Sequence, residues 1–296
     1  MNKNDFKENE ARFRKLAFNL GVTSFCCHGE LGTFEGSVDD LVVHGSYLRE
    51  GTWSASMLEL LQDGLFPNGE GTFLDVGANI GLVSIPLAEK RNVSCLAFEP
   101  EPTNFSLLES NILRHGVDSL IKAFNVALYS EETEIRLERS PSNSGDNRLK
   151  PGQSPRSEGI GEDLGVQVTA LPLDSLVDPE SLPRPIVMKM DTQGAEVRVL
   201  EGAQRVLSKV DYLISEYWPR GLLMMGDSAE RFWTLIKEFP FGAVLSQTSS
   251  EVSLQAVEEM SERLRWVPTD GSDDGFFDIL VTRHHTLPGL TSETSI

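Results

Sequence analysis

The stretch Thr72-Phe-Leu-Asp-Val-Gly-Ala-Asn-Ile-Gly-Leu82 decides the fold that we expect for this chain. The apolar residues at its start are typical of a strand that is buried on both faces of a parallel sheet, and Asp75 closes this strand. Gly77 and Gly81 bracket a tight turn, and a helical pattern follows it. The order of strand, glycine-rich turn and helix is the first half of a βαβ unit of the kind that binds nucleotides. The sequence therefore predicts an α/β domain with a mostly parallel sheet.

The same turn indicates the chemistry of a ligand. Its glycines are four residues apart with Asn79 between them, so it departs from G-x-G-x-x-G, the pattern that holds a dinucleotide pyrophosphate. Asp75 supplies a negative charge at the strand end, and the start of the next helix offers free N–H groups to a carboxylate. A ligand with both a carboxylate and a cationic centre fits such a turn, and S-adenosylmethionine is one. A glycine-containing turn that binds no ligand is the alternative.

Length and charge limit the classes of protein and partner. The chain of 296 residues is long enough for one large α/β domain or two small ones. Its net charge is −19, from 45 acidic and 26 basic residues. Such a surface repels phosphate backbones and anionic membranes, so we expect no nucleic-acid partner and no membrane partner. The first residues are charged rather than apolar and no run approaches the length of a membrane span, so we expect a cytoplasmic protein.

The cysteines give no sign of a metal site. Cys26, Cys27 and Cys95 have neither the spacing of metal ligands nor that of a disulfide framework. We therefore expect reduced, structural thiols and assign no residue to a metal, although a metal requirement stays open.

A second strand is predicted over residues 93–98, and it ends in Glu99-Pro100. The interval from Asp75 to Glu99 suits one strand–helix–strand unit. An acid at this position can accept hydrogen bonds from both ribose hydroxyls of an adenosine ligand, and an exposed loop acid is the alternative. Asn104, on the helix that follows, is either close to the ligand or polar surface. A third strand over 121–128 places Ala127 where an adenine ring would lie.

Two later strand ends carry further acids. A strand over 186–190 ends at Asp191, and another over 210–217 carries Glu216. Ligands of open α/β sheets bind beyond the carboxyl ends of the strands, so we expect these acids to gather with Asp75, Glu99 and Ala127 around one crevice. Asp191 would accept a proton from a substrate hydroxyl or fix the amino-acid part of the cofactor. Glu216 would accept a proton from a substrate hydroxyl, bind the substrate, or be a buried structural acid.

The remaining segments are predicted from their composition. Residues 140–165 are rich in Ser, Gly, Pro and charges, and they form either a lid that carries Ser144, Asn147 and Arg148 or a flexible insertion without a role. Near the N-terminus we predict a helix over 5–20, a small hairpin over 34–43 and a helix that begins within 47–61.

Several motifs together resemble one family. Asp75-Val-Gly-Ala-Asn-Ile-Gly81, Phe98-Glu-Pro100, Lys189-Met-Asp-Thr-Gln-Gly-Ala-Glu196 and Ser215-Glu-Tyr-Trp-Pro219 are similar, in this order, to the motif series of the FkbM family of S-adenosylmethionine-dependent methyltransferases. The segments Tyr47-Leu-Arg-Glu-Gly-Thr-Trp53 and Phe277-Asp-Ile-Leu-Val-Thr-Arg283 also resemble it. The resemblance implies a class I methyltransferase fold, Rossmann-like, with seven mostly parallel strands, the last antiparallel, and helices on both faces. It also implies O-methylation of a hydroxyl on a sugar or secondary metabolite.

The resemblance carries roles to individual positions. Asp75, Gly77, Asn79 and Gly81 would hold the methionine portion of the cofactor, and Glu99 the ribose. Pro100, Asn104 and Ala127 complete the expected cofactor-binding set. Asp191 and Glu216 are the expected catalytic residues, with Asp191 near the transferred methyl group. The methyltransferase domain would span 39–283, after an N-terminal helix and lead-in over 1–38 and before a polar tail over 284–296.

Other functions remain open at this point. A nicotinamide-dependent Rossmann oxidoreductase is disfavoured by the absent G-x-G-x-x-G motif. A non-catalytic protein that binds S-adenosylmethionine is a second alternative. The charge disfavours an RNA methyltransferase. The sequence leaves the identity of the small-molecule or glycan acceptor and the oligomeric state unassigned.

Overall fold

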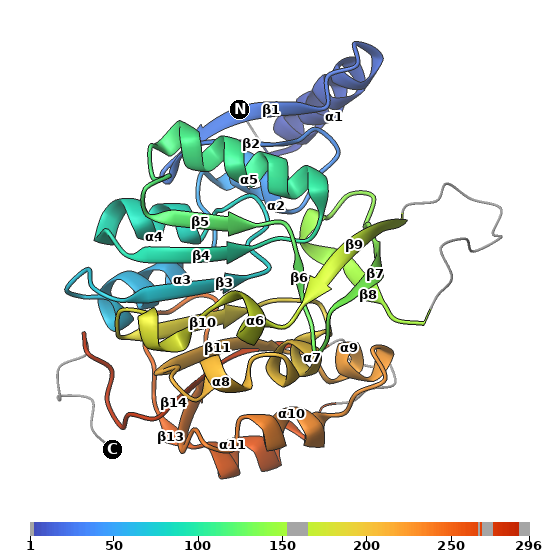
Figure 1. Ribbon diagram of the computed structural model, residues 1–296. Helices are drawn as coiled ribbons and strands as arrows, with labels where there is room; N and C mark the ends of the chain where they lie inside the picture. The colour runs from blue at the N-terminus through green and yellow to red at the C-terminus, as the bar shows by residue number, and fades with distance from the viewer. Residues whose placement is uncertain (1–2, 153–164, 266, 268–274, 290–296) are drawn as a thin grey trace.

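The strand predicted to end at Asp75 lies in the interior of the main sheet. The computed structural model describes residues 3–152, 165–265, 267 and 275–289. β3 (Thr72–Val76) is buried along its whole length and pairs in parallel with β4 (Ser94–Phe98) on one side and β10 (Ile186–Met190) on the other. Figure 1 shows the arrowheads of β3, β4 and β5 (Ile121–Phe124) pointing to the same side. The carboxyl ends of these strands therefore meet at one edge of the sheet.

The strand order is that expected of a class I methyltransferase. The main sheet runs β13-β12-β14-β11-β10-β3-β4-β5. The other strands of this sheet are β11 (Tyr212–Tyr217), β12 (Phe241–Val244), β13 (Gln255–Ala256) and β14 (Phe277–Thr282). β14 runs antiparallel to both of its neighbours, β11 and β12. The predicted seven strands with an antiparallel last strand are confirmed, and the two-residue β13 adds an eighth at the edge.

Helices cover both faces of this sheet because neighbouring residues of a buried strand point to opposite faces. Phe73 belongs to the apolar cluster under α4 and α5, whereas Leu74 belongs to the cluster under α7, α8, α10 and α11. The helices of the first face are α4 (Ser84–Arg91) and α5 (Pro102–His115). Those of the second face are α6 (Leu173–Leu176), α7 (Glu196–Glu201), α8 (Gln204–Leu207), α10 (Ala229–Leu235) and α11 (Val257–Leu264), and α9 (Pro219–Met224) follows β11. Among the described residues, no helix is both long enough and apolar enough to cross a membrane.

A second, four-stranded sheet stands beside the carboxyl edge of the first (Figure 1). Its order is β6-β9-β7-β8, with β6 (Ala127–Leu128), β7 (Thr133–Glu138), β8 (Arg148–Lys150) and β9 (Gly165–Leu171). The strand predicted over 121–128 is therefore wrong as one element, because β5 ends at Phe124 and Ala127 pairs with Ala170 in the second sheet. The described part of 140–165 is not a structureless loop, since it contains a helical turn over Ser144–Asp146 and β8. Residues 153–164, to which the prediction of a flexible insertion also applies, lie outside the described residues.

The N-terminal segment forms a helix and a hairpin, and the hairpin packs on the first face. α1 (Lys3–Asn19) is followed by β1 (Ser24–Gly29) and β2 (Gly32–Ser37), which pair antiparallel, then by α2 (Val43–Glu50), α3 (Ala55–Glu59) and a π-helical turn over Leu60–Leu65. The hairpin predicted over 34–43 is thus wrong in position. The Asp40 carboxylate accepts hydrogen bonds from the N–H groups of residues 42–44, and this cap starts α2 where a second strand was expected. Phe34 of β2 shares an apolar cluster with Leu108 of α5, so the lead-in is packed into the main core.

Gly77 allows two strand ends to approach each other. It has a φ of +86°, and a Cβ atom there would collide with the backbone carbonyl oxygen of Asp191. Gly116 also has a positive φ, +67°, but a Cβ atom added there would meet no heavy atom within 4 Å. We expect Gly116→Ala to lower the free energy of unfolding by about 1–2 kcal/mol through backbone strain alone. Gly77→Ala should cost about 1–3 kcal/mol more from the overlap. Urea unfolding of both variants measures this difference, and equal losses would contradict the proposed contact.

Candidate active site

A cavity of about 890 Å³ opens at the carboxyl edge of the main sheet. The ends of β3, β4, β10 and β11 and the start of β14 form its floor, and three other segments form its walls. These segments are the chain around α3, the stretch over 143–149 and the loop after β12. The cavity lies where ligands of open α/β sheets bind.

Most of the residues predicted for the site line this cavity. They are Asp75, Gly77, Asn79, Glu99, Pro100, Ala127, Asp191 and Glu216. The strand ends of a parallel sheet share one edge, and this explains why acids that are far apart in the sequence meet here.

Gly81 and Asn104 are the two predicted residues that the structure does not place in the lining. A Cβ atom at Gly81 would lie 2.6 Å from Ile85 Cδ1 and 2.8 Å from Leu108 Cδ1, so this glycine serves the close packing of α4 and α5. Asn104 is buried in the first turn of α5, where its N–H group donates to the Glu101 carboxylate at 2.7 Å. Neither residue lines the cavity, and their expected contact with the ligand stays a prediction.

Glu99 is held by the backbone of two neighbouring turns. Its Oε2 accepts a hydrogen bond from the Asn79 N–H group at 2.9 Å, and its Oε1 accepts one from the Glu101 N–H group at 2.9 Å. Burial raises the pKa of the Glu99 carboxyl to about 7, against the opposing effect of these two N–H groups. A carboxylate has about four lone-pair sites, so two remain for a ligand.

Asp75 is a buried acid whose carboxylate oxygens make no hydrogen bond within 3.5 Å to any described residue. It is 1% exposed, and neither carboxylate oxygen has a partner among the residues that the structure describes. Burial raises the pKa of Asp75, and the ammonium group of Lys189 and the nearby hydroxyl and N–H groups of Ser84 oppose this rise. Because buried polar groups are almost always paired, an unpaired carboxylate at a cavity wall indicates a place for a ligand.

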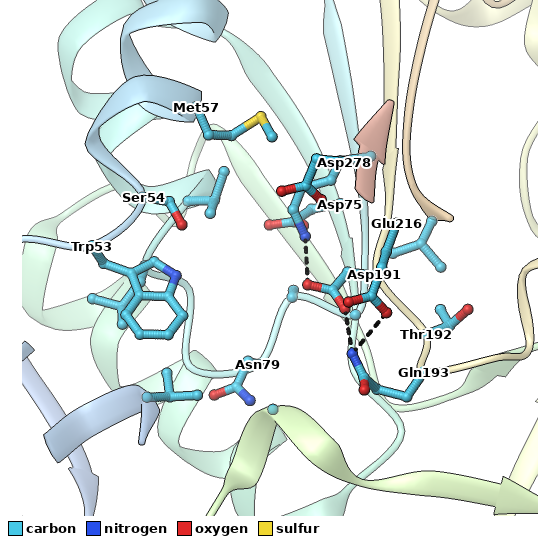
Figure 2. A pocket seen from close by; sticks show the side chains of 18 of the residues that line it. Trp53, Ser54, Met57, Asp75, Asn79, Asp191, Thr192, Gln193, Glu216 and Asp278 are labelled. Carbon is cyan, nitrogen blue, oxygen red and sulfur yellow. Dashed lines mark hydrogen bonds and ion pairs between the residues drawn. The ribbon is translucent and has the colours of Figure 1, made fainter. Parts of the chain in front are cut away.

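Three acids and a lysine stand next to Asp75. Figure 2 shows Asp191, Glu216 and Asp278 on the same side of the cavity as Asp75, and we call these four carboxyl groups the acidic rim. The side-chain amide of Gln193 donates to Asp191 Oδ1 at 2.9 Å and to Glu216 Oε2 at 3.0 Å (Figure 2). The ammonium group of Lys189 lies 3.4 Å from Asp191 Oδ2. Asp191 is thus held from two sides, while 43% of its side chain remains exposed.

Glu216 is an acid of the rim whose charged form is disfavoured by burial and by its acidic neighbours. Burial, and then the charges of Asp191, Glu196 and Asp278, raise the pKa of Glu216 from 4.5 to about 9. The folded chain therefore binds this proton more tightly than the unfolded chain, so stability falls as the pH rises from about 5 to 9. Glu216→Gln removes this titration and keeps an oxygen for Gln193.

We expect the melting temperature of Glu216→Gln to match that of the unsubstituted protein near pH 5 and to exceed it progressively towards pH 9. Thermal melts at pH 5, 7 and 9 measure the difference, with Glu132→Gln at an exposed position as the matched control. Parallel pH curves for the unsubstituted protein and Glu216→Gln would show that the carboxyl is not protonated in the folded state.

The wall opposite the acidic rim comes from the N-terminal part of the chain. Figure 2 shows Trp53, Ser54 and Met57 across the cavity from Asp191 and Glu216. Ser54 has a φ of +45°, a conformation that is uncommon for residues other than glycine and is found at functional sites. This wall therefore presents an aromatic ring to the carboxyl groups on the other side.

The stretch over 143–149 is tied to the glycine-rich turn. The Ser144 hydroxyl donates to Asp40 Oδ2 at 2.6 Å and accepts from the Asn79 side-chain amide at 3.1 Å. Asn147 and Arg148 also line the cavity. The residues named for a lid thus form part of the wall, and their movement over a ligand stays a prediction.

Several residues of the site escaped the sequence reasoning. The sequence prediction covers acids at the carboxyl ends of strands, and it omits Asp278 because this residue lies at the start of β14. β14 is antiparallel, so its start lies at the same edge, and Asp278 is the cross-strand partner of Glu216. Gln193 and Trp53 lie within the family-like motifs and line the cavity, but their sequence positions alone indicate no role.

The chain is similar in sequence to several known methyltransferases. The sequence model of the methyltransferase FkbM domain matches residues 75–239. Hexuronic acid methyltransferase AglP of Haloferax volcanii is 31% identical over 143 residues, which are 48% of this chain and 54% of that protein. Methyltransferase sdnD of Sordaria araneosa is 28% identical over 174 residues, 50% of this chain and 67% of that protein. The matches thus span about half to two-thirds of the length of these curated relatives.

A crystal structure of an FkbM methyltransferase from Methylobacillus flagellatus is also similar. Its TM-score is 0.42 at 15% identity, and the match covers 72% of this chain and 44% of that one. The family match covers more than half of the present sequence and includes the cavity-lining ends of β3, β4, β10 and β11. The chain belongs to the FkbM methyltransferase family.

Proposed function

We propose that this protein transfers a methyl group from S-adenosylmethionine to a hydroxyl of a sugar or secondary metabolite. The observation that carries the proposal is the buried, unpartnered Asp75 carboxylate, which faces the same cavity as Glu99 and Asp191. A cofactor with a positive charge and a polar ribose matches these groups. The family of the chain supports methyl transfer as the reaction.

The proposed cofactor site follows the strand ends. Asp75 and the turn that contains Gly77 and Asn79 would hold the methionine portion, since they offer a carboxylate and backbone groups at one place. Glu99, fixed by two N–H groups, would accept hydrogen bonds from the two ribose hydroxyls. Pro100 and Ala127 would border the adenine. Bound S-adenosylmethionine supplies an electrophilic methyl group.

Asp191 is the proposed general base. Its carboxylate is anchored by Gln193 and Lys189 yet remains partly exposed to the cavity, so it has lone pairs left for the proton of an acceptor hydroxyl. Glu216 has a pKa of about 9 and is therefore protonated at neutral pH. As a neutral acid it donates a hydrogen bond, and we assign it to holding the acceptor. Most of the expected gain in rate comes from positioning the two reactants.

The shape of the acceptor side favours a hydroxylated ring. Trp53 offers an apolar face, while Asp191, Glu216 and Gln193 across the cavity offer polar groups (Figure 2). A sugar has both an apolar face of C–H bonds and an edge of hydroxyls, and it fits between the two walls. The similarity to a hexuronic acid methyltransferase also supports a sugar as the acceptor.

Two measurements test the proposal in order. Titration calorimetry should show binding of both S-adenosylmethionine and S-adenosylhomocysteine. NAD should show no binding by itself and should not displace either ligand. Transfer of a radiolabelled methyl group is then measured for a panel of monosaccharides, glycosides and polyols, with RNA included as the contrasting acceptor. Folded protein that binds neither adenosyl ligand would overturn the proposal. Cofactor binding without transfer to any hydroxyl would reduce it to a binding protein.

A further inference from the structure

A buried ammonium group stands within the acidic rim. Lys189 lies on β10, and its backbone is in register with Asp75 on the neighbouring β3. Only 12% of its side chain is exposed, and its Nζ lies 3.4 Å from Asp191 Oδ2. Burial opposes the charge on Lys189, but Asp191, Asp75 and Asp278 outweigh it and raise the pKa of the lysine above its ordinary value. Lys189 is therefore a permanent positive charge at neutral pH.

Arg148 also lines the cavity, but its charge is compensated by groups outside the acidic rim. Its Nε donates to Asp146 at 2.9 Å, and its guanidinium group lies 4.7 Å from the ring centre of Trp218. Lys189, in contrast, has the carboxyl groups of the rim as its electrostatic partners. A change at Lys189 therefore alters the charge of the rim itself.

The charge of the rim matters because methyl transfer removes a positive charge from the cofactor. The acceptor oxygen forms a bond to the methyl carbon while the carbon–sulfur bond breaks, and its electron pair stays on sulfur. The hydroxyl proton passes to Asp191. A sulfonium is thereby converted into a neutral thioether. A fixed positive charge nearby raises the energy of the sulfonium and leaves that of the thioether almost unchanged.

We propose that Lys189 is a positioning residue that holds Asp191 towards the acceptor and weakens the preference of the acidic rim for the charged cofactor over its neutral product. This inference rests on the proposed function of the same cavity. It predicts that the affinities for S-adenosylmethionine and S-adenosylhomocysteine lie closer together with Lys189 present than without it.

The experiment compares the dissociation constants of S-adenosylmethionine and S-adenosylhomocysteine by calorimetry. Lys189→Met removes the charge and keeps the length of the side chain. We expect the Kd of S-adenosylhomocysteine divided by the Kd of S-adenosylmethionine to rise about three- to thirtyfold. Coulomb's law gives this range for the loss of one unit charge several ångströms from the sulfonium, at effective dielectric constants between about 20 and 80. Lys189→Arg should restore the original ratio.

Two further variants separate charge from structure. Lys209→Met is the matched control, because Lys209 forms its ion pair at the surface, with Glu180 at 2.8 Å. This variant should leave the ratio of the two dissociation constants unchanged. Asp191→Asn removes one negative charge from the rim and should move the ratio in the opposite direction. If Lys189→Met does not unfold cooperatively, the ratio measured for Asp191→Asn tests whether the charge of the rim controls the preference for the cofactor.

The outcomes are distinct. Binding of both ligands with a ratio that is the same in the unsubstituted protein, Lys189→Met and Asp191→Asn would overturn the inference and leave the proposed function standing. A shift in Lys189→Met that Lys189→Arg does not reverse would assign the effect to packing and also overturn it. If the unsubstituted protein binds neither ligand, the proposed function fails and the inference fails with it.

Discussion

Glu99→Ala should weaken the binding of S-adenosylmethionine and S-adenosylhomocysteine by the same factor. Loss of a hydrogen-bonded carboxylate costs about 1–3 kcal/mol, which is about 5- to 150-fold in Kd. The two ligands are affected alike because they share the ribose that Glu99 is proposed to hold. The substitution also leaves the N–H groups of Asn79 and Glu101 without the acceptor that they use in the structure. Calorimetry with both ligands measures the change.

The control for this prediction is an exposed glutamate outside the cavity. Glu132→Ala should leave both affinities unchanged, since the side chain of Glu132 is exposed. A thermal melt of Glu99→Ala shows whether the variant is folded when binding is measured. Unchanged affinities in folded Glu99→Ala would mean that the ribose is held by other groups. A loss confined to one of the two ligands would also contradict the ribose role.

Asp191→Asn should lower kcat by about 100- to 10,000-fold, the usual contribution of a positioned general base. The amide is close in size to the carboxylate but cannot take up the proton of an acceptor hydroxyl. The rate is measured at saturating S-adenosylmethionine, so a change in cofactor affinity does not enter it. The acceptor is the best one found among the hydroxylated compounds of the transfer assay.

Asp118→Asn, an exposed position, is the matched control and should keep the original kcat. If kcat of Asp191→Asn stays within about tenfold of that of the unsubstituted protein, Asp191 is not the base. Glu216 would then be the next residue to test, although its pKa of about 9 keeps it protonated at neutral pH. The two predictions are read from different quantities, because Glu99→Ala is measured as Kd and Asp191→Asn as kcat at saturating cofactor.

Much of the site could be predicted because it depends on local sequence. An apolar run that ends at an acid and a glycine-rich turn identifies a βα unit, and the carboxyl ends of parallel strands share one edge. The convergence of Asp75, Glu99, Asp191 and Glu216 on one cavity follows from this topology alone. No pairing between distant side chains had to be known.

The errors fall where packing between distant segments decides the structure. Ala127 belongs to the second sheet because it pairs with Ala170, more than 40 positions along the chain. Gly81 packs against Ile85 and Leu108 and does not line the cavity, and its positive φ is compatible with either role. The displaced hairpin depends on Asp40, whose carboxylate caps α2 where an extended strand was expected.

The sequence by itself determined the fold class, the family and the acids at the parallel strand ends, because each of these depends on residues that are neighbours along the chain. The tertiary structure alone decided the partners and charge states of those acids. It brought Asp278 beside Glu216 through an antiparallel strand, set Lys189 among the carboxyl groups of the rim, and placed Trp53 opposite them. Burial and Coulomb interactions depend on distances through space, which a local pattern does not contain.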